Sequence, residues 1–402
     1  MSAAPPGADA RGARGHVLVA GILCYGFDAV DFMMLALALP LLISEWHLTL
    51  GEAGLLGTAG MAGVGLSGIA LGWYADRHGR RRALLASVVT FALFTAALAF
   101  ARSRWDVMLL RLVAGLGLGG VWGSVAALVN ESFPRASRAR AISWVLSAWP
   151  VGVSLAAVIA GIVLPRHGWR GLFLLGALAL LAALYVLLFV PESGAWQAQR
   201  SATAGAATAR VGEIFSRAFL RNTLLGTLVA ASGLTAYWGI NTWLPTYLIR
   251  VHGLGTAAMA RYVLVLNAGM FLGYPLLGWL AGRVGKRRAL LLSYLAAAVL
   301  VPVYASFDDL DLLLWAGPVL AMFFSQAGLL GAYFPELYPT RIRALGAGFC
   351  FNVGRGLAAL APFVMGQLAT SIGLSRGIAL CGVVYLCAAG AMYLLPEEPA
   401  YG

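Results

Sequence analysis

Charged residues are scarce in this sequence: Asp, Glu, Lys and Arg together make up only 11% of the 402 residues. Soluble domains carry about 25% charged residues and about 45–50% apolar residues. Here 61% of the residues are hydrophobic, and the mean hydropathy is +0.84. A chain so poor in charge cannot cover its surface with water-facing side chains, so a soluble fold is excluded. The length leaves room for about twelve membrane spans of about 20 residues each.

Cysteine and histidine are also few, which argues against a metal centre or a disulfide framework. The four cysteines, Cys24, Cys350, Cys381 and Cys387, fall inside apolar segments and never form a CxxC pair. None of the five histidines lies well within an apolar run. The phosphate-binding pattern GxxxxGK[ST] is missing, which argues against an ATP-driven pump. We therefore expect no metal, no cofactor and no enzymatic activity.

Lysine is nearly absent, because Lys286 is the only one, and 27 arginines give most of the net charge of +12. The arginines cluster between apolar runs, which indicates a role in membrane topology and not a nucleic-acid partner. Nineteen of the 28 basic residues fall in loops on one side of the predicted spans and seven on the other. By the positive-inside rule, both termini are predicted to be cytoplasmic in a bacterial inner membrane.

Twelve apolar runs are each long enough to cross a bilayer as a helix. Strands of a membrane barrel would alternate over about ten residues, and these runs do not. The first run begins near Val17, is too long for a signal peptide, and reads as an uncleaved span. The runs lie near residues 17–42, 52–75, 83–101, 106–128, 141–164, 170–190, 223–249, 259–281, 289–305, 311–333, 344–370 and 375–395.

The sequence repeats itself across its two halves. Residues 72–85 read GWYADRHGRRRALL and residues 278–291 read GWLAGRVGKRRALL, with ten identities in fourteen positions. A second pair, Glu131-x-x-Pro134 and Glu336-x-x-Pro339, follows at nearly the same offset. We therefore predict an all-α membrane protein of twelve transmembrane helices in two pseudo-symmetric six-helix bundles. The predicted domains are residues 1–192 and 223–402, joined by a cytoplasmic linker at 193–222.

The segment at residues 72–81 resembles the signature loop of the major facilitator superfamily. Arg111-x-x-x-Gly115-x-Gly117-x-Gly119 in the fourth span also resembles a motif of that family. The resemblance covers essentially the whole chain. It implies two six-helix halves that rock about a central site.

Finer features are similar to the proton-coupled organic-acid branches, the aromatic-acid and sialic-acid symporters. The segment Tyr25-Gly-Phe-Asp28-Ala-Val-Asp31 resembles their two-aspartate motif, although Ala29 stands where the aromatic-acid group usually has glycine. Residues 243–248, Glu131-x-x-Pro134 and Asn352-x-x-Arg355 also look like these branches. The resemblance implies uptake of a small carboxylate together with a proton.

Two aspartates of the first span are the leading candidates for proton coupling. Burying a charge in a membrane costs about 2.5–3.5 kcal/mol on insertion scales, so a charge inside a span needs a reason. Asp28 and Asp31 are spaced i, i+3 and share a helix face. Two carboxylates held together in a poor dielectric do not both ionise easily, which favours proton uptake by one of them. We slightly favour Asp31; the alternative is a purely structural pair.

Two arginines also lie within spans. Arg355 offers a planar fork that matches a carboxylate, and Asn352 shares its helix face, so both are candidate substrate ligands. The alternative is that Arg355 only neutralises an aspartate. Arg111 lies five residues into its span, where it could extend to the outer surface. It is expected to form an interhelical or gating ion pair, with Asp28 among its plausible partners.

A further set of charges is expected to act as a gate on the cytoplasmic side. The family resemblance implies that the signature loop latches one state of the transporter. The expected pairs are Glu131 with Arg138 and Glu336 with Arg343, and Gly282 replaces Asp76 in the second copy. The predicted gating and latch residues are Arg111, within the fourth span, and the cytoplasmic residues Asp76, Arg77, Arg80, Arg81, Glu131, Arg138, Glu336 and Arg343.

Aromatic and amide side chains within the spans are candidates for lining the substrate pocket, although such residues also face lipid in many membrane proteins. The candidates are Tyr25, Trp149, Tyr237, Trp238, Asn241 and Gln326.

The leading hypothesis is a proton-coupled importer of a small organic anion that works by alternating access as a monomer in the lipid bilayer. The first alternative is a proton-driven exporter of drugs or metabolites, which has less use for Arg355. The second is a non-transporting membrane sensor.

Overall fold

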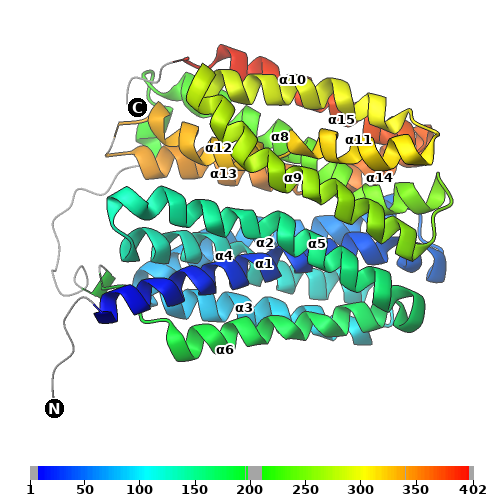
Figure 1. The fold of residues 1–402 in the computed structure, drawn as a ribbon, viewed down its shortest axis with the longest axis horizontal. Helices are drawn as coiled ribbons and strands as arrows, with labels where there is room; N and C mark the ends of the chain where they lie inside the picture. Colours follow the sequence, from blue (N-terminus) through cyan, green and yellow to red (C-terminus); the bar gives the residue numbers. More distant parts are fainter. Residues whose placement is uncertain (1–7, 195, 198–210, 340, 398–402) are drawn as a thin grey trace. The chain divides into compact units, whose positions relative to one another are not determined.

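The computed structural model describes residues 8–194, 196–197, 211–339 and 341–397, which form helices and no strands (Figure 1). Contacts between residues divide the chain into two compact units. Much of the expected linker, residue 195 and residues 198–210, lies outside the described residues. The domain limits given above therefore remain a prediction.

Unit 1 comprises the described residues within Met1–Met34, Ala59–Ala156 and His167–Gly205. In it α3 packs against both α4 and α6 (Figure 1). The end of α1, the beginning of α2 and residues 157–166 of α5 belong to unit 2. The elements are α1 Ala8–Glu45, α2 Leu50–His78, α3 Arg80–Ala97, η1 Leu98–Phe100, α4 Arg104–Ser132, α5 Arg135–Leu174, η2 Leu175–Leu178 and α6 Ala179–Phe189.

Unit 2 comprises the described residues within Leu35–Thr58, Ala157–Arg166 and Ala206–Gly402. Here α8 contacts α13 and α15, α10 contacts α15, and α9 contacts α11. The elements are η3 Val211–Phe215, α8 Leu220–Arg250, α9 Thr256–Val284, α10 Lys286–Ala305, α11 Leu310–Met322, α12 Gln326–Tyr333, η4 Phe334–Leu337, α13 Arg343–Ala358, α14 Ala361–Ile372 and α15 Leu374–Leu394.

The helices agree with twelve predicted membrane spans when the bent α2 is included and the longest candidate is counted as two. By length and composition, the described residues hold ten candidate spans, or eleven when the bent α2 is included. One of them, Arg140–Phe189, is 50 residues long, about 75 Å as a helix and so more than twice a bilayer core of about 30 Å. It turns back at Gly168, where φ is 62° and ψ is −168°, and therefore crosses twice. The all-α membrane fold is confirmed.

The outer surface of the helices suits a lipid environment. Large apolar side chains stay exposed along α6, α10 and α11, such as Leu181, Val299 and Trp315, each more than 60% exposed. Exposing this apolar surface to water would be unfavourable, whereas contact with the apolar lipid chains of a bilayer is not. Buried polar side chains, by contrast, lie between helices, and the candidate functional residues are among them.

Glycines of α4 allow three helices to approach closely. A Cβ atom at Gly115 would lie 2.0 Å from the carbonyl oxygen of Gly60 in α2, and one at Gly117 would lie 2.6 Å from the backbone nitrogen of Phe91 in α3. Small residues at these crossings let backbones pack directly, as is common between membrane helices. These glycines therefore serve helix packing.

We predict that Gly115→Val destabilises the protein, because the added carbons overlap the α2 backbone. The expected cost is about 1–3 kcal/mol, measured as a lower melting temperature of the purified protein in detergent. Gly123→Val is the matched control, because Gly123 lies on the same helix with nothing within 4 Å of its Cβ position. Equal melting temperatures of the two variants would contradict the close-packing role.

Candidate transport site

A buried ion pair joins α1 to α4. Arg111 Nη1 donates to Asp31 Oδ1 at 2.7 Å, and the two side chains are 2% and 3% exposed. The other carboxylate oxygen of Asp31 accepts a hydrogen bond from the Thr95 hydroxyl of α3. Both oxygens of this carboxylate are thus engaged, and three helices meet at it. The position of Arg111 near the start of α4 had suggested that it could extend to the outer surface. The structure shows instead that its side chain is buried.

The surroundings of Arg111 explain how a long cation fits between helices. Gly60 of α2 lies beside the guanidinium, where a Cβ atom would be 3.1 Å from Nη2. The Nε–H of Arg111 is buried and has no hydrogen-bond partner among the described residues. A buried donor without a partner is unfavourable, so the pair holds one unmet hydrogen bond. Asp28, one turn before Asp31, is also buried, with 2% exposure.

An aromatic cluster joins α1, the helix of the aspartates, to α4 and α5. The ring of Tyr25 lies 5.1 Å from that of Trp122 in α4 and 5.5 Å from that of Trp149 in α5. Phe32 is 5.7 Å from Trp149. The structure therefore brings the predicted residues Tyr25 and Trp149 together. Trp122, Phe32 and Thr95 were missed, because only a residue's partners in space distinguish them from ordinary span residues.

A second cluster of aromatic and polar residues lies in unit 2. Tyr237 contacts Trp238 and Phe324 with ring centroids 5.2 Å and 6.0 Å apart. Phe324 in turn stacks on Tyr385 of α15 at 6.1 Å. The predicted pocket residues Tyr237 and Trp238 thus share one cluster, to which the structure adds Phe324 and Tyr385.

Gln326 begins α12, just after the break that separates α11 from α12. Carbonyl groups near this break are satisfied by serines: Ser293 Oγ donates to the Phe323 oxygen at 3.0 Å, and Ser325 Oγ to the Met270 oxygen at 2.9 Å. The amide nitrogen of Gln326 is buried and, like the hydroxyl of Tyr385, has no hydrogen-bond partner in the part of the chain that the structure describes. Such atoms mark a place where a polar ligand would be stabilised.

Asn241 and the residues on α13 differ in their availability. The Asn241 side-chain nitrogen donates to the Tyr237 carbonyl of its own helix at 2.9 Å, so this donor is occupied. Arg355 is half-buried and Asn352 is exposed. Arg355 is thus more exposed than Arg111, which is only 2% exposed.

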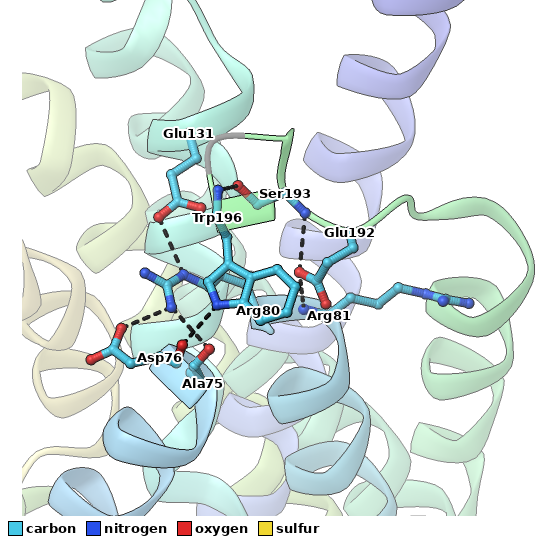
Figure 2. Close-up of polar contacts among 8 residues, drawn as sticks. All are labelled: Ala75, Asp76, Arg80, Arg81, Glu131, Glu192, Ser193 and Trp196. Carbon is cyan, nitrogen blue, oxygen red and sulfur yellow. Dashed lines mark hydrogen bonds and ion pairs between the residues drawn. The ribbon is translucent and has the colours of Figure 1, made fainter. Parts of the chain in front are cut away.

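The signature loop forms a charged network at one end of unit 1 (Figure 2). Arg80 Nη1 donates to Asp76 Oδ1 at 2.8 Å and to the Ala75 carbonyl at 2.9 Å, while its Nε donates to Glu131 Oε1 at 3.2 Å. Gly79, with φ of 109°, makes the sharp turn between α2 and α3. Glu131 therefore pairs with Arg80 and not with Arg138. Arg138 Nε instead donates to the Phe133 carbonyl at 2.8 Å.

Residues after α6 close over the same network. Glu192 Oε1 accepts from the backbone nitrogens of Arg81 and Ser193, both at 3.0 Å, and the Trp196 indole donates to the Asp76 carbonyl at 2.7 Å (Figure 2). Arg77 is exposed and lies over the Trp73 ring. The contacts of Glu192 and Trp196 were not predicted.

Unit 2 repeats this arrangement with substitutions. Gly285 has φ of 89°, Lys286 pairs with Glu336, and Arg287 and Arg288 pair with Glu397. Glu336 thus pairs with Lys286, and Arg343 donates to the Tyr338 carbonyl at 3.4 Å. A repeated Pro-Glu pair, at residues 191–192 and 396–397, is the sequence signal that could have indicated the closing contacts.

Comparisons with known proteins agree with this architecture. The family model described as the Major Facilitator Superfamily matches residues 21–358. The chain belongs to the Major Facilitator Superfamily; it is a multi-pass membrane transporter and not an enzyme.

The relatives of this chain include transporters of organic acids. The cis,cis-muconate transport protein of Acinetobacter baylyi is 32% identical over 93% of this chain and 92% of its own length. A niacin transporter of the same organism is 30% identical over 92% and 91%. The gallate transporter of Pseudomonas putida is 29% identical over 94% and 90%.

A solved structure supports the fold. The crystal structure of a D-xylose–proton symporter aligns with a TM-score of 0.77 over 96% of this chain and 98% of the other, at 16% identity.

We predict that Glu131→Gln destabilises the protein more than Asp76→Asn does. Asp76 has 75% of its side chain exposed, whereas those of Glu131 and Arg80 are only 22% and 12% exposed. An exposed ion pair contributes about 0–1 kcal/mol, and a less exposed one contributes more because water screens it less. The measurement is the melting temperature of each purified variant in detergent. An equal or larger loss in Asp76→Asn would contradict this order.

Proposed function

We propose that this protein imports a small organic anion, a carboxylate, together with a proton by alternating access across the bacterial inner membrane, with both termini in the cytoplasm. The observation that carries the proposal is the buried Asp31–Arg111 pair. The names of the relatives support the substrate class, because they include transporters of muconate, niacin and gallate.

The buried pair supplies a physical reason for proton coupling. When a proton neutralises Asp31, Arg111 is left as a buried charge without its partner, which costs about 3–5 kcal/mol. A nearly complete shift between two conformations takes about 5.5 kcal/mol, so protonation of one carboxylate supplies most of such a bias. Arg111 then favours the conformation that offers it another partner. Asp28, buried one turn away on α1, is the candidate.

Arg355 is the proposed anchor for the substrate carboxylate. Arg355 is half-buried and thus more exposed than Arg111, whose side chain is only 2% exposed. A planar fork binds a carboxylate through two parallel hydrogen bonds. Asn352, on the same face of α13, is proposed to add a polar contact.

The unit 2 cluster is proposed to receive the body of the substrate. The rings of Tyr237, Trp238 and Phe324 offer flat apolar surfaces, on which an unsaturated or aromatic acid would stack. The amide nitrogen of Gln326 is a buried donor for a hydroxyl or carbonyl oxygen of the substrate. This chemistry fits an aromatic or diene carboxylate better than a saturated one.

Uptake into proteoliposomes tests the function. The panel would contain muconate, gallate, gentisate, nicotinate and sialic acid, with an imposed pH gradient. Accumulation driven by an inward proton gradient and abolished by an uncoupler is the expected result. Expulsion of the substrates under the same gradient would instead favour the exporter.

We predict that Asp31→Asn loses acceleration of uptake by the proton gradient but keeps substrate exchange between equal compartments, because exchange needs no net proton movement. Radiolabelled uptake and counterflow in proteoliposomes measure the two activities. Asp311→Asn, on the exposed first turn of α11, is the control for the loss of one carboxylate. Gradient-driven uptake at the wild-type rate in Asp31→Asn would refute its role, and the same experiment on Asp28→Asn assigns the proton.

We predict that Arg355→Lys raises the KM for the carboxylate by about tenfold or more, because lysine keeps the charge but loses the bidentate fork. Initial rates of uptake over a range of substrate concentrations measure this effect. Arg261→Lys, at an exposed position of α9, is the matched control and should keep the wild-type KM. An unchanged KM in Arg355→Lys would remove the anchor role.

A further inference from the structure

An open groove of about 500 Å³ lies in unit 1, outside the proposed transport site. The beginning of α1, the first turn of α3 and the end of α6 surround it. It is lined by Gly12, Ala13, His16, Arg81, Leu188, Phe189, Val190 and Pro191. One wall is therefore basic and the other is apolar.

Arg81 supplies a fixed positive charge in the groove. Its Nε and Nη2 donate to the carbonyl oxygens of Val186 and Leu187 at 3.4 Å and 2.6 Å. These bonds satisfy the end of α6 and hold the guanidinium in place. A guanidinium has five N–H donors, so further donors remain for an anion. Figure 2 shows the Arg81 side chain extending away from Glu192, whose carboxylate is turned toward backbone nitrogens.

His16 is held rigidly at the same place. Its Nδ1 lies 2.8 Å from the Tyr185 hydroxyl, and its ring stacks on Phe189 with centroids 5.3 Å apart and an angle of 15°. When the tyrosine hydroxyl donates to Nδ1, the proton of the imidazole sits on Nε2 and is available to an acceptor. Arginine and histidine donors fixed in one groove are a typical combination for a phosphate group.

The apolar wall of the groove continues along the outside of α6. Leu184, Leu187 and Leu188 are 50%, 53% and 63% exposed. At helical spacing they share one face, which runs from the groove along the membrane-facing surface. A ligand that matches both the basic wall and the apolar face has an anionic headgroup and long apolar chains.

We propose that this groove binds the headgroup phosphate of an anionic phospholipid. Arg81 and His16 bind the phosphodiester, and the acyl chains lie along the exposed leucines of α6. Basic pockets between membrane helices bind anionic lipid headgroups in this way. Free phosphate shares the headgroup chemistry, but it has no use for the apolar face, which favours the lipid.

Native mass spectrometry of the purified full-length transporter tests the proposal. Phosphatidylglycerol, phosphatidylcholine and inorganic phosphate would be titrated separately into the protein in detergent. Gly12→Glu places a negative charge in the groove, where nothing lies within 4 Å of a Cβ atom at Gly12. Gly212→Glu makes the same change of net charge in η3 of unit 2, again with nothing within 4 Å.

Phosphatidylglycerol is expected to bind more tightly than phosphatidylcholine. Gly12→Glu should weaken its binding about fivefold, Gly12→Lys should strengthen it, and Gly212→Glu should leave it within about twofold of wild type. Equal weakening by the two glutamate variants, equal binding of the two lipids, or displacement of the lipid by an equal concentration of inorganic phosphate would each overturn the proposal.

Discussion

A charge inside a membrane protein is tolerated only when another charge meets it, and the Asp31–Arg111 pair is where this constraint is strongest. Both side chains are almost completely buried between α1, α3 and α4. Removing one partner leaves the other without compensation, at a cost of several kcal/mol. In the proposed mechanism, protonation of Asp31 would remove this compensation, and the packing of the three helices would respond to a single proton.

The remainder of unit 1 is built around this pair. Gly60 makes room for the guanidinium, and Gly115 lets α2 and α4 approach closely enough to enclose it. At the end of the same helices, Arg80 ties Asp76 to Glu131 (Figure 2). Arg111 lies near the beginning of α4, and Glu131, which pairs with Arg80, lies near its end. Displacement of Arg111 would thus move the beginning of α4 while the Arg80 network holds its end. This gives the proposed coupling a mechanical path within one unit.

Much of the fold could be predicted from the sequence, because the twelve apolar runs and the repeat with ten identities in fourteen positions can be read directly from the sequence. Individual pairings could not. Arg111 was expected to form an ion pair, but its partner is Asp31, and Glu131 pairs with Arg80, because sequence spacing does not specify which side chains of different helices meet. The turn at Gly168 lies between the predicted runs 141–164 and 170–190, so hydropathy did indicate it. The break before Gln326 lies inside the predicted run 311–333 and is a backbone feature that hydropathy does not report. Thr95, Trp122 and Phe324 became visible only through their neighbours.

The central claim is that Asp31 takes up the transported proton and thereby releases Arg111. Difference infrared spectroscopy of the reconstituted protein observes this directly, because a protonated carboxyl group has a C=O stretch that a carboxylate lacks. On acidification with substrate present, a protonated-carboxyl band should appear in wild type and be absent from Asp31→Asn. A band that persists in Asp31→Asn and disappears in Asp28→Asn would contradict the account.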